Sequence, residues 1–403
     1  MTRILAHPGA RACLAVGDLL VHLRQYRAST WCYHGAVRLV PDWSLIQHRL
    51  AWALRWTGNL REAESTFTAL LEAFPAATGA SLDFAMLLQD QDRHIEAIAV
   101  LDRALICRER DARLHTLRGV SLERLGHLPD AIGALRLAVA LDDSDPDAVL
   151  NLGAALARDR RWDEAVKWDT RAMQVRPEAT AAYNLGTALM QLNRNAEAEA
   201  AFRTGLACKV QPKELTVACG VGVAVAIGRQ DRADEALQHA ERLLEGSPDD
   251  LGVRNALCAS LIAVDQAQRA LTVARDTVRL HPSHAMAYVS LGWAHLTAEE
   301  PDQALAAFER AVLMGEAERR PASQRTHESA LAYISDPPEV NAGRRAALSA
   351  LGRHREAVEA FEQVLAREPH YVERDPLAAE PTGHRNSSLA GVRRKIAKAD
   401  ASR

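Results

Sequence analysis

The sequence repeats itself with a period of 34 residues, and this period limits the fold more than any other feature of the chain. An alanine marks one phase of the repeat: Ala63, Ala97, Ala131, Ala165, Ala198, Ala236, Ala270, Ala304 and Ala357. A larger side chain follows four residues later in most copies: Tyr33, Phe67, Leu101, Leu135, Phe202, Phe308 and Phe361. A very small residue stands twelve residues before the alanine phase: Gly17, Ala51, Ala85, Gly119, Gly153, Gly186, Ala224 and Gly292. A proline often closes the unit: Pro41, Pro75, Pro177, Pro248, Pro282 and Pro369.

This pattern predicts a pair of antiparallel helices in each repeat. The small residue of the first helix and the alanine of the second allow the two backbones to approach closely, and the larger side chain fills the space beside them. Gly58, Gly126 and Gly352 fall between the two helices, where the residue that ends a helix often adopts a left-handed conformation. Because proline cannot continue a helix, it ends the second one. The chain is therefore expected to be all-α.

Several of these units resemble tetratricopeptide repeats, notably 148–153 followed by 163–165, and 183–186. Ten units cover about 340 residues, and they start at Ala10, Ser44, Thr78, Ala112, Pro146, Ala179, Val217, Leu251, Ala285 and Pro338. The resemblance implies an α-solenoid of about ten helix-turn-helix repeats that form a right-handed superhelix, with the first helices lining a concave groove.

Departures from the pattern suggest how the chain is divided. We expect an N-terminal lead (1–9), repeats one to six (10–212), repeats seven to nine (213–318), an insertion (319–337), repeat ten (338–371) and a basic C-terminal tail (372–403). Repeat seven carries three glycines in its first helix, each costing about 1 kcal/mol relative to alanine. They predict a soft joint before residue 213; tight packing without special motion is an equal alternative. Arg345 replaces the small residue of repeat ten, so its first helix should pack differently. The tail is either a basic arm that meets a partner or a solvated terminal helix.

Charge and composition exclude several classes of partner. A net charge of -3 and a pI near 6.6 give no general attraction to nucleic acid. The most apolar long run, 215–228, is shorter than the roughly 20 residues that span a bilayer, so no membrane insertion is expected. Six cysteines without regular spacing favour a reducing compartment, and we predict a cytoplasmic protein. The alanine- and arginine-rich composition suggests a bacterial source.

No motif for catalysis or metal binding survives inspection. Walker, HExxH, CxxC and GxSxG patterns are absent from the sequence. The acidic run 142–147 lacks the glycine and the closing glutamate of a calcium loop, so helix capping is the better interpretation. His281 and His284 straddle Pro282 instead of sharing a helix face. We therefore expect no catalytic residues, no metal and no cofactor.

A polar patch in the middle of the chain is the first candidate binding site. In related repeats, an asparagine two residues before the small position hydrogen-bonds a peptide backbone, and Asn151 and Asn184 occupy that place here. The neighbouring residues expected on the same inner face are Arg124, Arg158, Tyr183, Thr187 and Gln191. Carboxamides suit an extended peptide, although the two asparagines could instead satisfy backbone groups within the stack. None of the first helices, as placed, carries the lysines of the chaperone-binding relatives, so binding to chaperone tails is not predicted.

An aromatic patch is the second candidate. Trp52 and Trp56 lie one helical turn apart, with Arg55 beside them, and exposed Trp and Arg are typical of binding hot spots. Trp31 and Trp43 are expected instead to seal the N-terminal end of the stack.

These observations lead to three hypotheses. The first is a non-catalytic scaffold that binds a protein or peptide partner in the concave groove. The second is an accessory or regulatory subunit that tethers a separate enzyme chain. The third, and least favoured, is an enzyme built on the solenoid. A second copy of the chain could also dock on the solenoid ends, giving a homo-oligomer.

Overall fold

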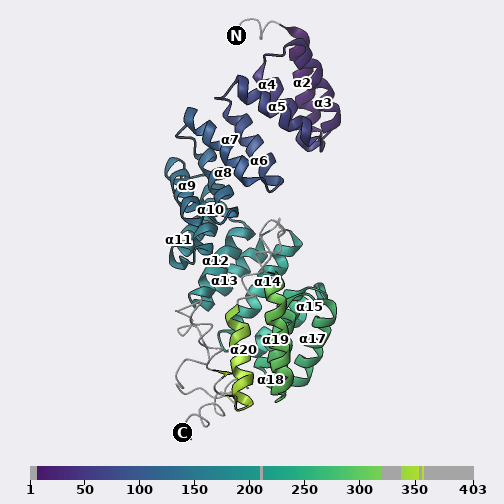
Figure 1. Cartoon of the computed structure of the whole chain (residues 1–403), viewed down its shortest axis with the longest axis vertical. Coiled ribbons are helices and arrows are strands. Elements are labelled where there is room, and N and C mark those ends of the chain that lie inside the picture. The colour runs from purple at the N-terminus through teal and green to yellow at the C-terminus, as the bar shows by residue number, and fades with distance from the viewer. Residues whose placement is uncertain (1–6, 209–211, 319–336, 354–355, 358–403) are drawn as a thin grey trace. The chain divides into compact units, whose positions relative to one another are not determined.

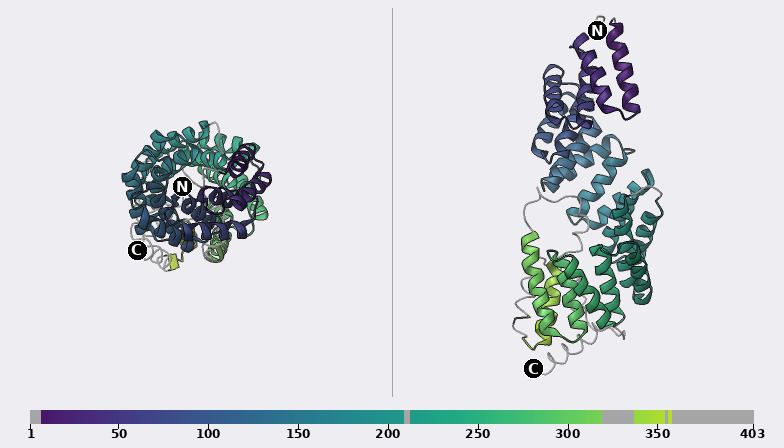
Figure 2. Two further views of the ribbon diagram at one scale, coloured as in Figure 1. Left: turned by 90° about the horizontal axis from the view of Figure 1, so that it is seen from above. Right: turned by 90° about the vertical axis from the view of Figure 1, so that its right-hand side faces the viewer.

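The computed structural model describes residues 7–208, 212–318, 337–353 and 356–357, and these residues contain helices and no strands. The chain divides into two compact units, residues 1–176 and 177–403, each described by itself. Both units are built from consecutive helices that lie side by side (Figures 1 and 2). Each unit is therefore an all-α solenoid, as predicted.

The first unit contains five helix pairs: α2 (Pro8–His22) and α3 (Tyr26–Leu39), α4 (Ser44–Trp56) and α5 (Leu60–Ala73), α6 (Thr78–Asp90) and α7 (His94–Cys107), α8 (Ala112–Arg124) and α9 (Leu128–Leu141), and α10 (Pro146–Arg158) and α11 (Trp162–Val175). One core cluster of this unit runs from Tyr33 to Leu114 and is formed by side chains that α3 to α8 turn inward.

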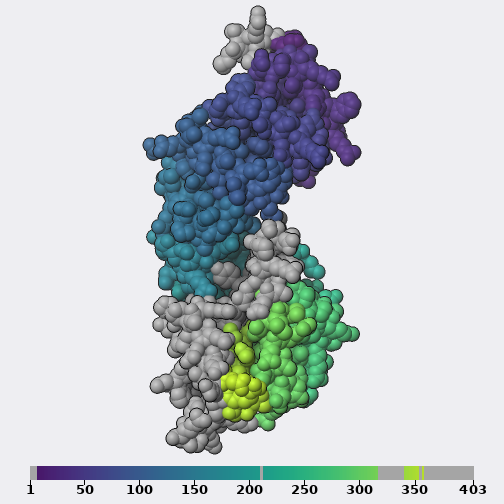
Figure 3. Space-filling view, viewed as in Figure 1, coloured from purple at the N-terminus to yellow at the C-terminus, as the bar shows by residue number. Residues whose placement is uncertain are grey.

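The second unit continues the same pattern: α12 (Ala179–Gln191) and α13 (Asn195–Ala207), α14 (Lys213–Gly228) and α15 (Ala233–Gly246), α16 (Leu251–Ala263) and α17 (Ala267–Leu280), α18 (Ala285–Thr297) and α19 (Pro301–Glu318), followed by α20 (Pro337–Ala350). The last helix packs against both α18 and α19, and it lies beside α19 on the surface drawn in Figure 3.

The helix starts follow the sequence repeat closely. Seven of the expected starts, from Ser44 to Ala285, are the first residues of α4, α6, α8, α10, α12, α16 and α18. The first helix of repeat seven begins at Lys213, four residues before the expected Val217. One first helix therefore does carry a lysine, at its first position, which the sequence-based placement had missed.

The small and large phases of the repeat meet directly, as the pattern predicted. A Cβ added to Gly119 would lie 2.6 Å from Leu135 Cγ, and one added to Gly186 would lie 2.7 Å from the ring of Phe202. Such approaches are shorter than van der Waals contact, so the large side chain occupies the space that a second side chain would need. The core of each repeat thus depends on a glycine or alanine in its first helix.

Close packing also explains two of the glycines in α14. A Cβ on Gly222 would meet Phe202 at 2.8 Å, and one on Gly220 would meet Leu243 at 2.6 Å. Whether this region acts as a soft joint stays a prediction. In α20, Gly343 faces Phe308, with a Cβ distance of 2.2 Å, while Arg345 is only half-buried. The tenth repeat therefore packs through a glycine two residues before the expected small position.

The turn between the two helices of a repeat uses one backbone conformation throughout the described residues. Every one of these turns contains a residue with positive φ: Arg24, Gly58, Asp92, Gly126, Arg160, Asn193, Asp231, Asp265, Glu299 and Gly352. In most of these turns the next residue donates its N–H to a carbonyl five residues earlier, as Asn59 does to Leu54 at 3.0 Å. This is the hydrogen bond of a Schellman ending, which requires the left-handed residue. Only three of the ten turns use the glycine that favours this conformation.

Some predicted features lie outside the described residues. These are the first six residues of the lead, 319–336 of the insertion, most of the second helix of repeat ten, and the basic tail. Among the helices that the structure describes, none combines the length and the apolar character needed to cross a membrane.

Candidate partner-binding site

Three aromatic rings gather in the first unit where the start of α3 meets the end of α4. Trp56 stacks on Tyr26 with ring centroids 5.7 Å apart and planes inclined by 23°. Trp52 meets Tyr26 edge-on at 5.9 Å and lies 5.8 Å from Trp56. These distances suit favourable aromatic pairs. Tyr26, which sequence reasoning did not single out, completes the cluster that we call the aromatic cluster (Tyr26, Trp52 and Trp56).

The two tryptophans of the aromatic cluster have different surroundings. Trp52 is partly buried and packs against the core cluster that runs from Tyr33 to Leu114. Trp56 ends α4 and leaves 53% of its surface exposed. Trp56 is thus the member that a partner can reach, while Trp52 is anchored in the core.

Arg55 holds this arrangement in place. Its guanidinium donates to Asp90 Oδ2 on α6 at 2.5 Å, and only 12% of its side chain is exposed. The same guanidinium carbon lies 5.7 Å from the centre of the Trp56 ring, within cation–π range. Arg55 was predicted as a partner-contacting residue, but the structure gives its guanidinium an intramolecular partner, Asp90.

A pocket of about 520 Å³ opens beside the exposed ring. We call it the turn pocket, because its lining comes from the turn between α2 and α3, the first turn of α3 and the end of α4: Arg24, Gln25, Tyr26, Arg27, Ala28, Trp56 and Thr57. Arg24 and Arg27 are exposed, and their side chains make no hydrogen bond or ion pair with any residue that the structure describes. The aromatic cluster therefore forms one wall of a pocket whose charged lining is cationic.

The remaining tryptophans of the first two repeats behave differently from each other. Trp43 packs on a small cluster with Ala10, Ala36 and Ile46, as expected for a residue that seals the first repeat. Trp31 is 82% exposed on α3, so it does not seal the described part of the stack.

The polar patch expected around Asn151 and Asn184 is divided between the two units. In the first unit, Asn151 donates from Nδ2 to the Asp147 carbonyl of its own helix at 2.8 Å. Arg158 forms an ion pair with Glu123 at 2.8 Å. Arg124 is exposed at the end of α8, and its charge adds to burial in lowering the pKa of His94. Two of these three side chains thus have partners in the fold.

In the second unit, Tyr183 belongs to the core. It is 8% exposed, its ring lies 5.8 Å from that of Phe202, and burial raises the pKa of its hydroxyl. Thr187 donates to the Tyr183 carbonyl at 2.9 Å, and Gln191 ends the same helix. Asn184 is half-buried and makes no hydrogen bond with the described residues. The structure therefore favours Asn184 over Tyr183 as a side chain available to a ligand.

Asp169 is a buried acid that sequence reasoning missed. It stands on α11 at the phase where other repeats carry Tyr33, Leu135 or Phe308, and it has no exposed surface. A Cβ on Gly153 would come within 2.1 Å of its Oδ1. Neither carboxyl oxygen has a hydrogen-bond partner among the described residues, and burial raises the pKa of Asp169 well above its usual range. The one signal in the sequence was an acid at an otherwise apolar phase.

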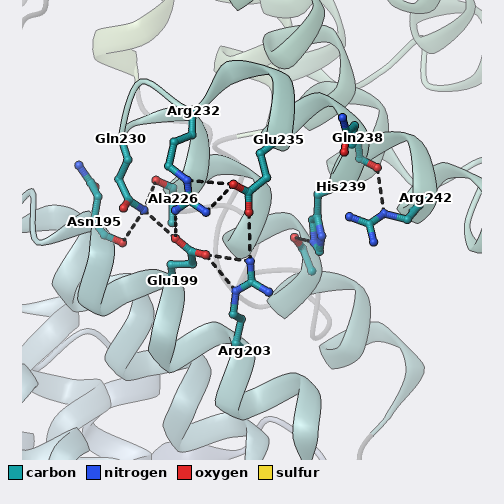
Figure 4. A network of polar contacts seen from close by, with 11 residues as sticks. Asn195, Glu199, Arg203, Ala226, Gln230, Arg232, Glu235, Gln238, His239 and Arg242 are labelled. Carbon is teal, nitrogen blue, oxygen red and sulfur yellow. Dashed lines mark hydrogen bonds and ion pairs between the residues drawn. The ribbon is translucent and has the colours of Figure 1, made fainter.

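A second buried acid, Glu199, is fully satisfied (Figure 4). Its carboxylate accepts from Arg203 at 2.8 Å, Arg232 at 2.7 Å and Gln230 at 2.9 Å, and so joins α13 to the turn before α15. Burial alone would raise the pKa of Glu199, but these hydrogen bonds outweigh it and hold the pKa below its ordinary value. Glu199 is therefore a structural anchor between neighbouring repeats of the second unit.

The acidic run 142–147 serves the structure of the chain. Asp145 accepts from the backbone N–H of Asp147 at 3.0 Å and caps α10, as the capping interpretation of the acidic run predicted. No group of three His, Cys, Asp or Glu side chains that could hold a metal ion occurs among the described residues.

Comparison with known families points to a single repeat type. Three family models described as tetratricopeptide repeat match the chain, over residues 45–120, over 116–174, 169–211 and 260–323, and over 346–371. No curated protein matches the chain.

Several solved structures are similar to this chain. A tetratricopeptide repeat protein from Parabacteroides merdae ATCC 43184 is 18% identical with a TM-score of 0.51, covering 63% of this chain and 96% of its own. PilF of Pseudomonas aeruginosa is 16% identical with a TM-score of 0.45, covering 52% and 95%. MamA from Desulfovibrio magneticus RS-1 is 20% identical with a TM-score of 0.38, covering 42% and 96%. At these identities the likeness concerns the fold alone.

Proposed function

The chain belongs to the tetratricopeptide repeat family, and from this premise we propose that it is a non-catalytic scaffold that binds a protein or peptide partner. Stacked helix pairs create extended surfaces, and such surfaces serve binding in repeat proteins. The fold by itself does not choose the partner, so the proposal depends on a particular site.

The observation that carries the proposal is the exposure of Trp56 on a rigid support. Trp56 keeps 53% of its surface in solvent, and burying such a ring against a partner is strongly favourable. Its orientation is fixed by the stacking of Tyr26 and by the ion-paired Arg55. A preorganised aromatic side chain loses little entropy on binding, which is a property of interface hot spots.

Asn184 is a secondary contact in this proposal. A half-buried carboxamide without an internal partner can both donate to and accept from an extended peptide backbone. Asn151 is less suited to this role, since its amide already donates within α10.

The proposed compartment is the cytoplasm. All six cysteines are free, which suits a reducing environment.

Affinity capture from the native lysate, followed by quantitative mass spectrometry, tests the proposal. We expect Trp56→Ala to lower recovery of at least one stoichiometric partner tenfold or more, as loss of a hot-spot residue does. Trp31→Ala is the matched control, because Trp31 is even more exposed but lies outside the aromatic cluster. Equal recovery with all three proteins would show that the aromatic cluster is not the binding site. An enzyme as the stoichiometric partner would instead identify an accessory subunit, and turnover by the purified chain alone would contradict the non-catalytic assignment.

A further inference from the structure

We infer that the turn pocket binds an acidic peptide segment that carries an aromatic residue. This inference rests on the proposed scaffold function and specifies the chemistry of the partner. It concerns Arg24, Arg27 and Trp56, which line the turn pocket between the start of α3 and the end of α4. These residues are separate from the polar patch that the sequence predicted around Asn151 and Asn184.

The aromatic half of the specificity comes from the stacked rings. Trp56 stacks on Tyr26 at an interplanar angle of 23° and keeps 53% of its surface exposed. A planar side chain can pair with the exposed part of this ring, whereas an aliphatic one cannot use the ring quadrupole. The turn pocket, of about 520 Å³, is open to solvent, so an aromatic side chain can reach Trp56 there.

The acidic half comes from two cations without internal partners. Arg24 and Arg27 line the pocket, are exposed, and pair with no acid among the described residues. No acidic residue lines the turn pocket. A guanidinium binds carboxylates through paired hydrogen bonds, so this lining favours acidic segments and repels basic ones.

Two acids of the first three repeats are already engaged within the fold. Asp90 accepts from Arg55 at 2.5 Å, and Asp18 accepts from the Tyr33 hydroxyl at 2.7 Å and lies 3.6 Å from Arg49. Arg11, Arg38 and Arg61 of these repeats also pair with no acid among the described residues, so what distinguishes Arg24 and Arg27 is that both line the turn pocket. An external carboxylate would supply the missing charge.

Single-stranded nucleic acid also combines anionic charge with flat rings, but the wider charge distribution disfavours it. Nucleic-acid sites track a phosphate backbone with an extended basic surface. The chain has a net charge of -3, and many of its arginines are held in intramolecular ion pairs. A compact pocket with two cations fits a short acidic segment better.

Selection of a random peptide library on the full chain tests the inference, with affinities of the enriched peptides then measured by fluorescence anisotropy. We expect enriched peptides to place acidic residues beside an aromatic one. Their affinity should fall at least tenfold with Arg24→Glu/Arg27→Glu and with Trp56→Ala, and should weaken as salt rises. The control is Arg103→Glu/Arg108→Glu, which makes the same charge change at two exposed arginines of α7 and its C-terminal end, outside the turn pocket. Circular dichroism verifies that each variant keeps its helicity.

Three outcomes would overturn the inference. The first is enrichment of peptides without acidic residues. The second is an equal loss of affinity in the control variant, which would indicate a general effect of charge. The third is a pocket variant that loses binding to a single-stranded oligonucleotide but keeps every enriched peptide. The scaffold function and the acidic specificity can also be separated. If Trp56→Ala loses its partner in the lysate but Arg24→Glu/Arg27→Glu leaves the affinity of the enriched peptides unchanged, the scaffold function stands and only the acidic specificity fails.

Discussion

Asp169 offers the sharpest test of the physical argument, because it places an acid where the repeat calls for an apolar side chain. We expect Asp169→Leu to stabilise the first unit. The preceding repeat shows that leucine fits this environment, since Leu135 lies against Gly119 as Asp169 lies against Gly153. The substitution therefore changes the chemistry of the site without demanding a new packing arrangement.

The magnitude follows from two terms. A buried polar group without a hydrogen-bond partner destabilises a protein by about 1–3 kcal/mol, and Asp169 has two such oxygens. Burying a leucine side chain adds roughly 1.5–3 kcal/mol when the site is well filled. Because the two terms are not fully additive and the larger side chain needs some adjustment, we expect a net gain of about 2–4 kcal/mol at pH 7.

The gain should also depend on pH. Burial raises the pKa of Asp169, so the folded chain retains a proton that the unfolded chain has released. Stability of the wild type therefore falls as pH rises above the unfolded pKa of about 3.9, until the folded pKa is reached. The advantage of Asp169→Leu should accordingly shrink by up to about 1.4 kcal/mol for each pH unit on going from pH 7 to pH 5. Asp169→Asn removes the titration but leaves a buried polar group, so it should gain less and show no such pH dependence.

Tryptophan fluorescence during urea unfolding gives a suitable assay. Six of the seven tryptophans, all except Trp293, lie in the first unit, so the fluorescence signal reports mainly on that unit. Unchanged slopes with a higher midpoint would indicate a change in stability alone. A leucine variant that is equally or less stable than the wild type, or a difference that does not vary between pH 5 and pH 7, would refute the account of Asp169 as a buried, protonated and unsatisfied acid.

Three further predictions test the repeat architecture. Asp265→Gly should stabilise the second unit by about 1 kcal/mol, because φ of Asp265 is 61° and glycine adopts that conformation without the strain of a side chain. Gly126→Ala should destabilise the first unit, because φ of Gly126 is 82°. Thermal unfolding followed by circular dichroism measures both changes. Glu199→Ala should destabilise the second unit by about 1–3 kcal/mol, since it removes a buried acceptor shared by two arginines and a glutamine. Urea unfolding should show that this loss of stability diminishes as pH falls through the lowered pKa of Glu199. A loss that does not diminish would contradict the hydrogen-bonded carboxylate. Gly222→Ala should lower the unfolding midpoint because its Cβ would lie 2.8 Å from the Phe202 ring, whereas Gly246→Ala, with nothing within 4 Å of its Cβ, should leave stability unchanged or slightly higher.

The prediction of the fold succeeded because its determinants are local and recur. Helix starts follow from residues at fixed phases, and the glycine–large pairs such as Gly186 and Phe202 stand sixteen residues apart, within one helix pair. The candidate site was harder to predict, because the fate of a polar side chain depends on groups far away in the sequence. Arg55 was expected to contact a partner, but its guanidinium donates a hydrogen bond to Asp90, which lies 35 residues later in the sequence. Tyr183 was expected on an open face, yet Phe202 and the surrounding helices bury it.

The sequence by itself determined the class of the fold and most of its helix boundaries, since a 34-residue period of small, large and turn residues leaves few other ways to bury the apolar phases. It also excluded the common catalytic and metal-binding motifs. Only the tertiary structure decided which charges are free. Ion pairs and burial arise between neighbouring repeats, so the lone acid Asp169, the satisfied acid Glu199 and the unmatched arginines of the turn pocket became distinguishable once the helices had been packed against one another.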